Sequence, residues 1–181
     1  MYMYPSYYPS FYWGNMMPYN YTYIGGNPFY PVSPFMDIER QGLRDYGGEP
    51  FVINIEKATE ENRNFRRALW TGKHLQVTLM SIPPGQDIGL EVHPNVDQFL
   101  RIEEGQGMVM MGDRRDRLTF SQRVFEDYAI MVPAGKWHNI VNTGSTPLKL
   151  YSIYAPPEHP FGTIHATQKD AKASEGHRKY Y

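Results

Sequence analysis

The chain has 181 residues, enough for one domain of ordinary size with flanking segments. Its formal net charge of −1 gives no electrostatic basis for a nucleic-acid partner, so we expect none. No apolar run approaches the roughly 18 residues of a membrane span. No segment has the charged and apolar regions of a signal peptide, so we expect a cytoplasmic protein. Because cysteine is absent, any metal site must use His, carboxylate or amide ligands.

Residues 1–36 form a low-complexity tail that is rich in tyrosine and proline. It holds nine of the fifteen tyrosines and six prolines, and the first charged residue is Asp37. Prolines at this density prevent regular helix and interrupt sheet ladders, so the composition favours a disordered segment. The alternative is an assembly element, because uncharged aromatic tracts associate and tyrosines can be cross-linked by oxidation. Residues 37–50, where charge and clustered glycines appear, are predicted to be a linker.

From residue 51 to about 157 the pattern changes to short strands separated by turn residues. This pattern predicts an all-β sandwich or barrel without βαβ units. Residues 56–62 alone look helical or turn-like, and the polar extension 158–181 is expected to form a short surface helix or to fray. The expected strands are Phe51–Ile55, Phe65–Trp70, His74–Ile82, Gly89–His93, Gln98–Glu103, Gly107–Met111, Arg117–Phe125, Ala129–Val132, Trp137–Asn142 and Leu148–Ala155.

Two of the six histidines stand beside other potential metal ligands. Glu91 and His93 are two residues apart, so in a strand their side chains point to the same face. His138 follows a Pro133-Ala-Gly135 turn, and Gln98 begins the next expected strand after His93. Two imidazoles and one carboxylate suit Fe, Mn, Ni or Zn, with Gln98 as a weak fourth ligand or a hydrogen-bond donor. The alternative is a buried hydrogen-bonded Glu–His pair without metal.

The segment around Glu91 resembles the first motif of the cupin family. In that motif a Gly precedes a His-x-His pair, which is followed by a Glu and a closing Gly. Here Gln86 stands near the place of the opening Gly, Glu91 replaces the first His, and His93 is the second. Gln98 stands where Glu is usual, and Gly105 closes the motif in register.

The second segment resembles the second cupin motif, in which Pro-x-Gly precedes a His and an Asn. Asp127 replaces the opening Gly of that motif, whereas Pro133, Gly135, His138 and Asn142 fall in register. The two motifs together imply a cupin double-stranded β-helix, which is a jelly-roll barrel, over roughly residues 51–157. Residues 154–163 are similar to a stretch of small bacterial single-domain cupins often described as mannose-6-phosphate isomerase-like.

The resemblance implies a metal-binding cupin with Fe, Mn, Ni or Zn on Glu91, His93, Gln98 and His138. Such a protein would act on a small-molecule substrate as a dioxygenase or isomerase. The resemblance also implies a homodimer formed through edge strands. Two alternatives remain. One is a structural spore-coat or surface-layer protein that assembles through the Tyr-rich tail, and the other is a non-catalytic small-molecule-binding cupin. Candidate wall residues of the barrel are Phe99, Met108, Met110 and Trp137.

Overall fold

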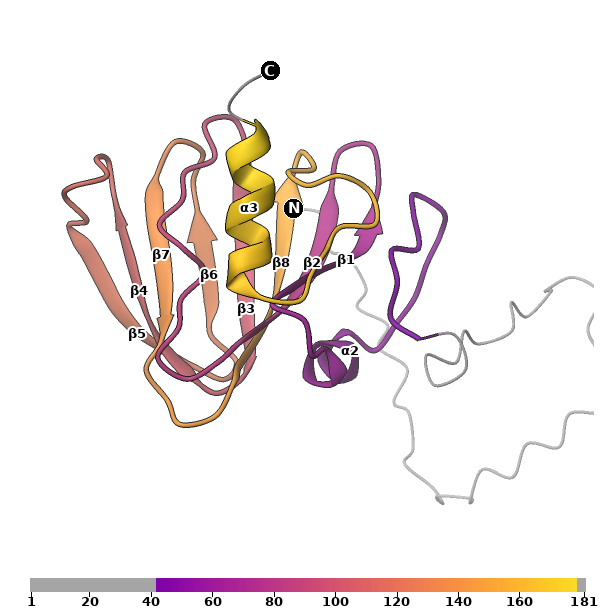
Figure 1. Ribbon diagram of the computed structural model, residues 1–181, viewed down its shortest axis with the longest axis horizontal. Helices are drawn as coiled ribbons and strands as arrows, with labels where there is room; N and C mark the ends of the chain where they lie inside the picture. Colours follow the sequence, from indigo (N-terminus) through magenta and orange to yellow (C-terminus); the bar gives the residue numbers. More distant parts are fainter. Residues whose placement is uncertain (1–41, 179–181) are drawn as a thin grey trace, which may run out of the picture. The chain divides into compact units, whose positions relative to one another are not determined.

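A computed structural model describes residues 42–178 of the chain (Figure 1). The tail 1–36 and the first five residues of the expected linker lie outside the described residues. The elements in chain order are α2 (Ile55–Glu61), β1 (Arg66–Thr71), β2 (Gln76–Ile82), β3 (Asp97–Glu104), β4 (Gln106–Gly112), β5 (Phe120–Phe125), β6 (Ala129–Val132), β7 (Trp137–Asn142), β8 (Leu148–Ala155), β9 (Ile164–His165) and α3 (Gln168–Arg178).

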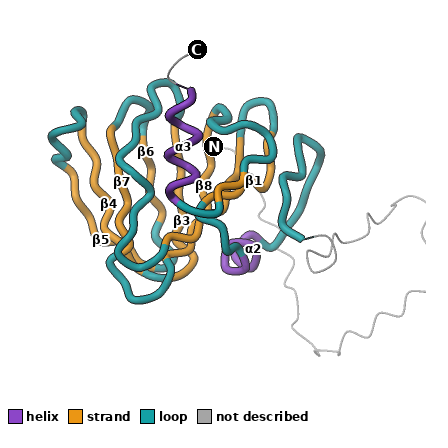
Figure 2. The backbone as a smooth tube through the Cα atoms, viewed as in Figure 1, coloured by secondary structure: helices purple, strands orange, loops and turns teal. Residues whose placement is uncertain are grey.

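The strands form two antiparallel sheets (Figure 2). The main core lies between them. One sheet has six strands in the order β6-β3-β8-β2-β1-β9, and the other has three in the order β5-β4-β7. Side chains from both sheets meet in a single apolar cluster that includes Met80, Leu100, Val109, Ile140 and Leu150. Burial of this shared cluster holds the sheets face to face, because apolar area removed from water is the main favourable term in folding. The all-β prediction is confirmed.

Strand β2 shows how the large sheet separates an inner and an outer face. Met80 belongs to the core between the sheets, whereas its neighbour Leu79 packs with Ala58 of α2 on the outer face. Because successive side chains alternate, Gln76 and Thr78 share the inner face with Met80. Both polar residues are fully buried. The barrel interior is therefore apolar at one end of β2 and polar at the other.

The expected strand Phe51–Ile55 is wrong. Residues 51–54 have no regular structure, and helix α2 begins at Ile55. The cause is Asn54, whose side-chain oxygen accepts a hydrogen bond from the Lys57 N–H at 3.0 Å and caps the helix. Phe51 and Ile53 still pack against the outer cluster, but they do so from a loop. The helical pattern predicted over residues 56–62 is confirmed.

Two further differences from the sequence-based expectations concern strand β9 and residues 89–93. No pattern predicted β9, a two-residue strand that pairs with β1. The expected strand Gly89–His93 is reduced to one isolated bridge, between Glu91 and His138. Gly89 has a φ of +94°, outside the extended region, so a regular strand cannot pass through it.

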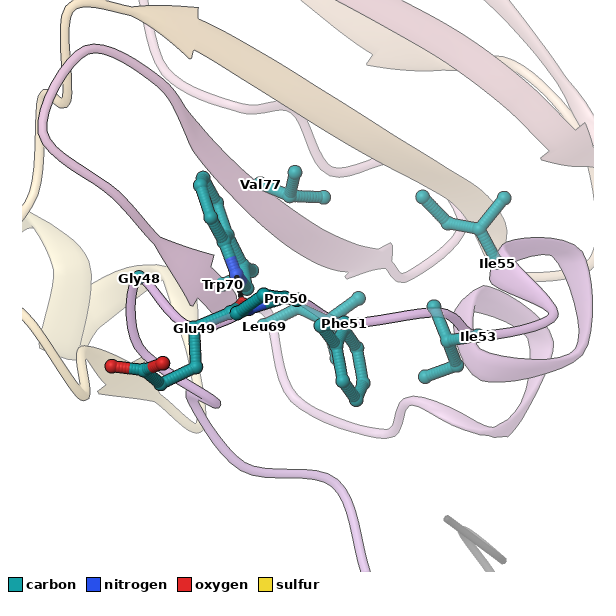
Figure 3. A pocket seen from close by; sticks show the side chains of 9 residues that line it. All are labelled: Gly48, Glu49, Pro50, Phe51, Ile53, Ile55, Leu69, Trp70 and Val77. Carbon is teal, nitrogen blue, oxygen red and sulfur yellow. Dashed lines mark hydrogen bonds between the residues drawn. The ribbon is translucent and has the colours of Figure 1, made fainter. Parts of the chain in front are cut away.

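An apolar pocket of about 360 Å³ lies against the outer face of the large sheet (Figure 3). Leu69 and Val77 of the outer cluster form its floor, and the Trp70 indole N–H donates to the Glu49 carbonyl at 2.9 Å. The pocket belongs to the outer cluster and is separate from the polar end of the barrel interior. Its full lining is Gly48, Glu49, Pro50, Phe51, Ile53, Ile55, Leu69, Trp70 and Val77.

Within residues 42–178, no helix is both long enough and apolar enough to cross a membrane. The longer of the two described helices, α3, has 11 residues and a polar sequence.

The core between the sheets predicts a specific loss of stability when it is truncated. Leu150 is fully buried in that core, so Leu150→Ala should lower the free energy of unfolding by about 2–5 kcal/mol. Val52 is 92% exposed, so Val52→Ala should change it by less than about 0.5 kcal/mol. Urea unfolding of both variants measures the difference, and equal losses would contradict the assigned core.

Candidate metal centre

Glu91 and His138 are brought together by the backbone. Each donates its N–H to the carbonyl of the other, at 3.0 Å from Glu91 and 2.9 Å from His138. Residues that exchange both hydrogen bonds lie directly opposite in an antiparallel pair, so their side chains point to the same face. In β7 that face is the barrel interior, because Ile140, two residues after His138, belongs to the core. Both side chains therefore enter the barrel interior.

His93 joins this pair from two residues further along the chain. The Gly135 N–H donates to the His93 carbonyl at 2.8 Å, which ties His93 to the turn before β7. The Asp97 carboxylate accepts from the Ala134 N–H at 2.8 Å and anchors the other side of that turn to β3. Glu91 and His93 therefore meet at one place, as their spacing predicted. An isolated bridge and a turn position them, instead of a regular strand.

One carboxylate oxygen lies between two imidazole nitrogens. Glu91 Oε1 is 3.4 Å from His93 Nε2 and 3.4 Å from His138 Nε2. All three atoms are buried, and none has a partner in hydrogen-bonding geometry among residues 42–178. Buried polar atoms are almost always satisfied, so three such atoms at one point indicate a missing common partner.

The tautomer of His138 shows what kind of partner is missing. Its Nδ1 lies 3.0 Å from the Lys136 carbonyl, which can only accept a hydrogen bond. Nδ1 therefore carries the proton in the neutral ring, and Nε2 presents a lone pair to the Glu91 carboxylate. Two electron-rich atoms that face each other in a buried site repel, and a proton or a metal ion between them would relieve that repulsion. This arrangement is the one that metal-ligating histidines use, with the outer nitrogen donating to a backbone carbonyl.

The spacing of the three donor atoms is compatible with one bound ion. Bonds of about 2.1 Å to a common metal would place neighbouring ligand atoms about 3.0 Å apart in octahedral geometry and about 3.4 Å apart in tetrahedral geometry. The two distances of 3.4 Å from Glu91 Oε1 meet this requirement. All three donor atoms lie within 4.8 Å of one another, so only small side-chain rotations separate the observed arrangement from ligation.

Two charged residues surround the cluster, and sequence patterns did not single them out. Glu158 Oε1 lies 3.5 Å from His93 Nδ1, and Arg66 Nη2 lies 3.5 Å from Glu91 Oε2. Arg66 is fully buried in β1, where it shares the interior with the cluster. A carboxylate behind a ligating imidazole fixes the orientation of the ring and raises its basicity. An arginine beside a ligating carboxylate stabilises the ionised form and offsets its negative charge.

These neighbours shift the pKa values of the cluster strongly. Burial acts to raise the pKa of Glu91, but His93 and Arg66 lower it, and that pKa is held well below its usual range. Burial acts to lower the pKa of His93, but Glu158 and Glu91 outweigh it and raise that pKa to about 9. In the metal-free protein a proton on His93 therefore occupies part of the place that a metal ion would take.

Gln98 lies on the inner face of β3, buried, with its Nε2 donating to Ser152 Oγ at 2.9 Å. Its Oε1 is buried without a hydrogen-bond partner among the described residues. Gln98 pairs with Tyr154 in the sheet, and the Tyr154 ring centroid is 5.5 Å from that of His93. Gln98 is thus near the cluster, with a free acceptor atom.

The prediction that Phe99, Met108, Met110 and Trp137 line the barrel interior is wrong, because strand alternation places all four on outer faces. Phe99 lies on the outer face, where its ring centroid is 6.1 Å from that of Tyr151 in the outer cluster. In β4 and β7, Val109 and Ile140 face the core, so Met108, Met110 and Trp137 point outward. Met111, which lies opposite His138 in the sheet and packs against the core, faces inward instead.

Three other histidines, His74, His159 and His165, do not join the cluster. His74 is exposed in the turn before β2. His159 is buried, and its backbone N–H and carbonyl are both bound by the Gln76 amide. Its ring stands edge-on to Tyr154, with 5.0 Å between centroids. His165 Nε2 lies 3.0 Å from Ser174 Oγ of α3. Among the described residues, one group of three or more His, Asp or Glu side chains could hold a metal ion, and it consists of Glu91, His93 and His138.

Comparison with known proteins identifies the family of this barrel. The model of the cupin domain, Cupin_2, matches residues 78–154, which contain both sequence motifs. The chain belongs to the cupin family, and its two sheets form the double-stranded β-helix of that family.

Individual relatives match nearly three quarters of the chain. The chain is 67% identical to YrkC of Bacillus subtilis (strain 168) over 133 residues, which cover 74% of this chain and 72% of YrkC. It is 37% identical to L612 of Acanthamoeba polyphaga mimivirus over 137 residues, covering 72% and 84% of the two chains. The crystal structure of BH2720 from Bacillus halodurans superposes with a TM-score of 0.72 at 66% identity, covering 72% of this chain and 99% of that one.

The raised pKa of His93 predicts how the stability of metal-free protein depends on pH. Because that pKa is about 9 in the folded state and near 6.5 in the unfolded state, its contribution is fully present below pH 6.5. It is lost as the pH rises through 9, and it amounts to roughly 3 kcal/mol at most. Urea unfolding of chelator-treated protein between pH 6 and pH 10 measures this loss.

His93→Gln should remove that pH-dependent part of the stability, and His74→Gln, at an exposed position, should keep it. The same pH profile in wild type and His93→Gln would show that His93 is not the titrating group.

Proposed function

We propose that the protein is a metal-binding single-domain cupin whose ion is held by Glu91, His93 and His138. The observation that carries this proposal is the convergence of three buried donor atoms that have no other hydrogen-bond partner among the described residues. Gln98 supplies a fourth, weaker ligand or a hydrogen bond to a group on the ion. Two imidazoles with one carboxylate suit Fe, Mn, Ni or Zn.

A bound divalent ion would act as a Lewis acid or activate oxygen, which is the chemistry of a small-molecule isomerase or dioxygenase. The chain's own residues define how a substrate would be held. Burial raises the pKa of Tyr154 to about 12, so its hydroxyl keeps its proton. The Thr78 hydroxyl is buried without a hydrogen-bond partner among the described residues and lies on the same inner face. These two hydroxyls can hydrogen-bond a substrate that enters the polar end of the barrel.

The charges around the site favour a substrate with a single negative charge. Arg66 contributes +1, and Glu91 and Glu158 contribute −1 each, while ligating histidines are neutral. A divalent ion brings the sum to +1, which one carboxylate or enolate would neutralise. Because buried charges are costly unless they are compensated, such an anion is the class of small molecule that the loaded site fits best. A non-catalytic cupin that binds the same class of molecule is the alternative.

We also propose that the protein is a homodimer. Strands β6 and β9 end the large sheet, and β5 and β7 end the small one, so each sheet leaves edge strands with unpaired backbone groups. Pairing between two copies is one way in which proteins cover such edges.

The metal proposal predicts that loss of any one ligand removes the ion. Elemental analysis and titration calorimetry of full-length protein with Mn, Fe, Ni and Zn should find one equivalent of bound metal per chain. Glu91→Ala, His93→Ala and His138→Ala should each weaken metal affinity at least 100-fold. Gln98→Ala should have a smaller effect, and the exposed control His74→Ala should have none.

Failure of the wild-type protein to take up any of the four metals would overturn the proposal. So would equal metal binding by wild type and by folded Glu91→Ala and His138→Ala.

Residues 1–36 support a second, compatible role in assembly, as in a spore coat or surface layer. Their tyrosine-rich, uncharged composition favours self-association. Deletion of residues 1–36 should leave metal binding unchanged but reduce both the assembly size measured by light scattering and the dityrosine fluorescence after peroxidase treatment. An unchanged assembly size would contradict this role.

A further inference from the structure

A second cavity, of about 310 Å³, lies at the opposite end of β8 from the metal centre. Lys149 lines this cavity and Tyr154 lies beside the metal centre. The two are five residues apart on one strand, or roughly 16 Å. The lining residues come from the segment between α2 and β1, the end of β2 and the loop after it, the start of β8, and the segment that leads into α3: Arg63, Phe65, Ser81, Pro83, Gln86, Pro147, Lys149, Ala166, Thr167 and Gln168.

The charged residues that line this cavity are all positive. Lys149 and Arg63 both line it, and no Asp or Glu does. Lys149 is only 3% exposed, and its ammonium donates to the Asn62 carbonyl, a neutral acceptor. No ion pair of residues 42–178 includes Lys149 or Arg63.

A buried ammonium without an anionic partner is costly, since burial removes its hydration and a single carbonyl does not neutralise it. Burial lowers the pKa of Lys149, and the nearby charge of Arg63 lowers it further. Glu104 and Glu60 act in the opposite direction, but neither lies within ion-pair distance of the amine. Glu104 lies opposite Lys149 in the sheet and offsets part of its charge, but no described carboxylate lines the cavity or forms an ion pair with Lys149 or Arg63.

We propose that this cavity is a binding site for a small oxyanion, either a phosphate or a carboxylate group carried by a small molecule. Lys149 and Arg63 supply the charge, and Ser81 and Gln86 supply neutral hydrogen-bond donors on the same lining. The volume is at the lower end of the roughly 300–1,000 Å³ of small-molecule sites, so it accommodates a group larger than a bare ion. The site is separate from the metal centre and does not depend on it.

Thermal unfolding and titration calorimetry of full-length protein, with inorganic phosphate and with acetate at constant ionic strength, test this site. The wild type should show saturable stabilisation by at least one of the two anions, and the stronger response identifies the preferred group. Lys149→Met, which keeps the length of the side chain, and Arg63→Gln should each weaken the affinity for that anion at least tenfold. The exposed control Lys73→Met should bind like wild type.

The variant His138→Ala distinguishes anion binding in this cavity from anion binding at the proposed metal centre, and it should retain the anion response. Arg63 is exposed, so Arg63→Gln gives a reading even if Lys149→Met does not fold. The proposal is overturned if wild type shows no saturable response to either anion, if folded Arg63→Gln binds as tightly as wild type, or if His138→Ala abolishes the response.

Discussion

The structure of this cupin depends on one pair of backbone hydrogen bonds, those that Glu91 and His138 exchange. They join the two sequence motifs, and they fix a carboxylate and an imidazole on the same face of the barrel. His93 follows two residues later and is held by its own bond to Gly135. The proposed metal centre is therefore positioned by main-chain geometry, and its three donor atoms lie within 4.8 Å of one another.

This placement has an electrostatic consequence. An oxygen of Glu91 lies between two imidazole nitrogens, and in the neutral His138 ring, whose Nδ1 faces the Lys136 carbonyl, Nε2 directs a lone pair at that oxygen. A proton on His93, supported by Glu158, relieves part of this repulsion in the metal-free protein. A metal ion would relieve all of it. In the proposed site, metal and proton would compete for one place, which would link metal affinity, pH and stability.

The sequence predicted most strands, because alternation and turn residues are local signals. Glu91 and His93 could be paired from their spacing, and His138 from the resemblance to the cupin motifs. Arg66 and Glu158 could not be found in this way, because they reach the site from a separate strand and from a loop after β8, and only tertiary structure brings them there. The strand expected at Phe51 failed because the Asn54 cap starts a helix. Phe99 was misplaced because its neighbour Gln98 faces the interior, and strand alternation then turns Phe99 to the outer face.

The most direct test is anomalous X-ray diffraction from crystals of the full-length protein grown with Mn, Fe, Ni or Zn and measured at the absorption edge of that metal. The account predicts one strong anomalous peak within about 2.0–2.3 Å of Glu91 Oε1, His93 Nε2 and His138 Nε2. A peak elsewhere on the protein, or no peak in protein that retains the cluster, would contradict it.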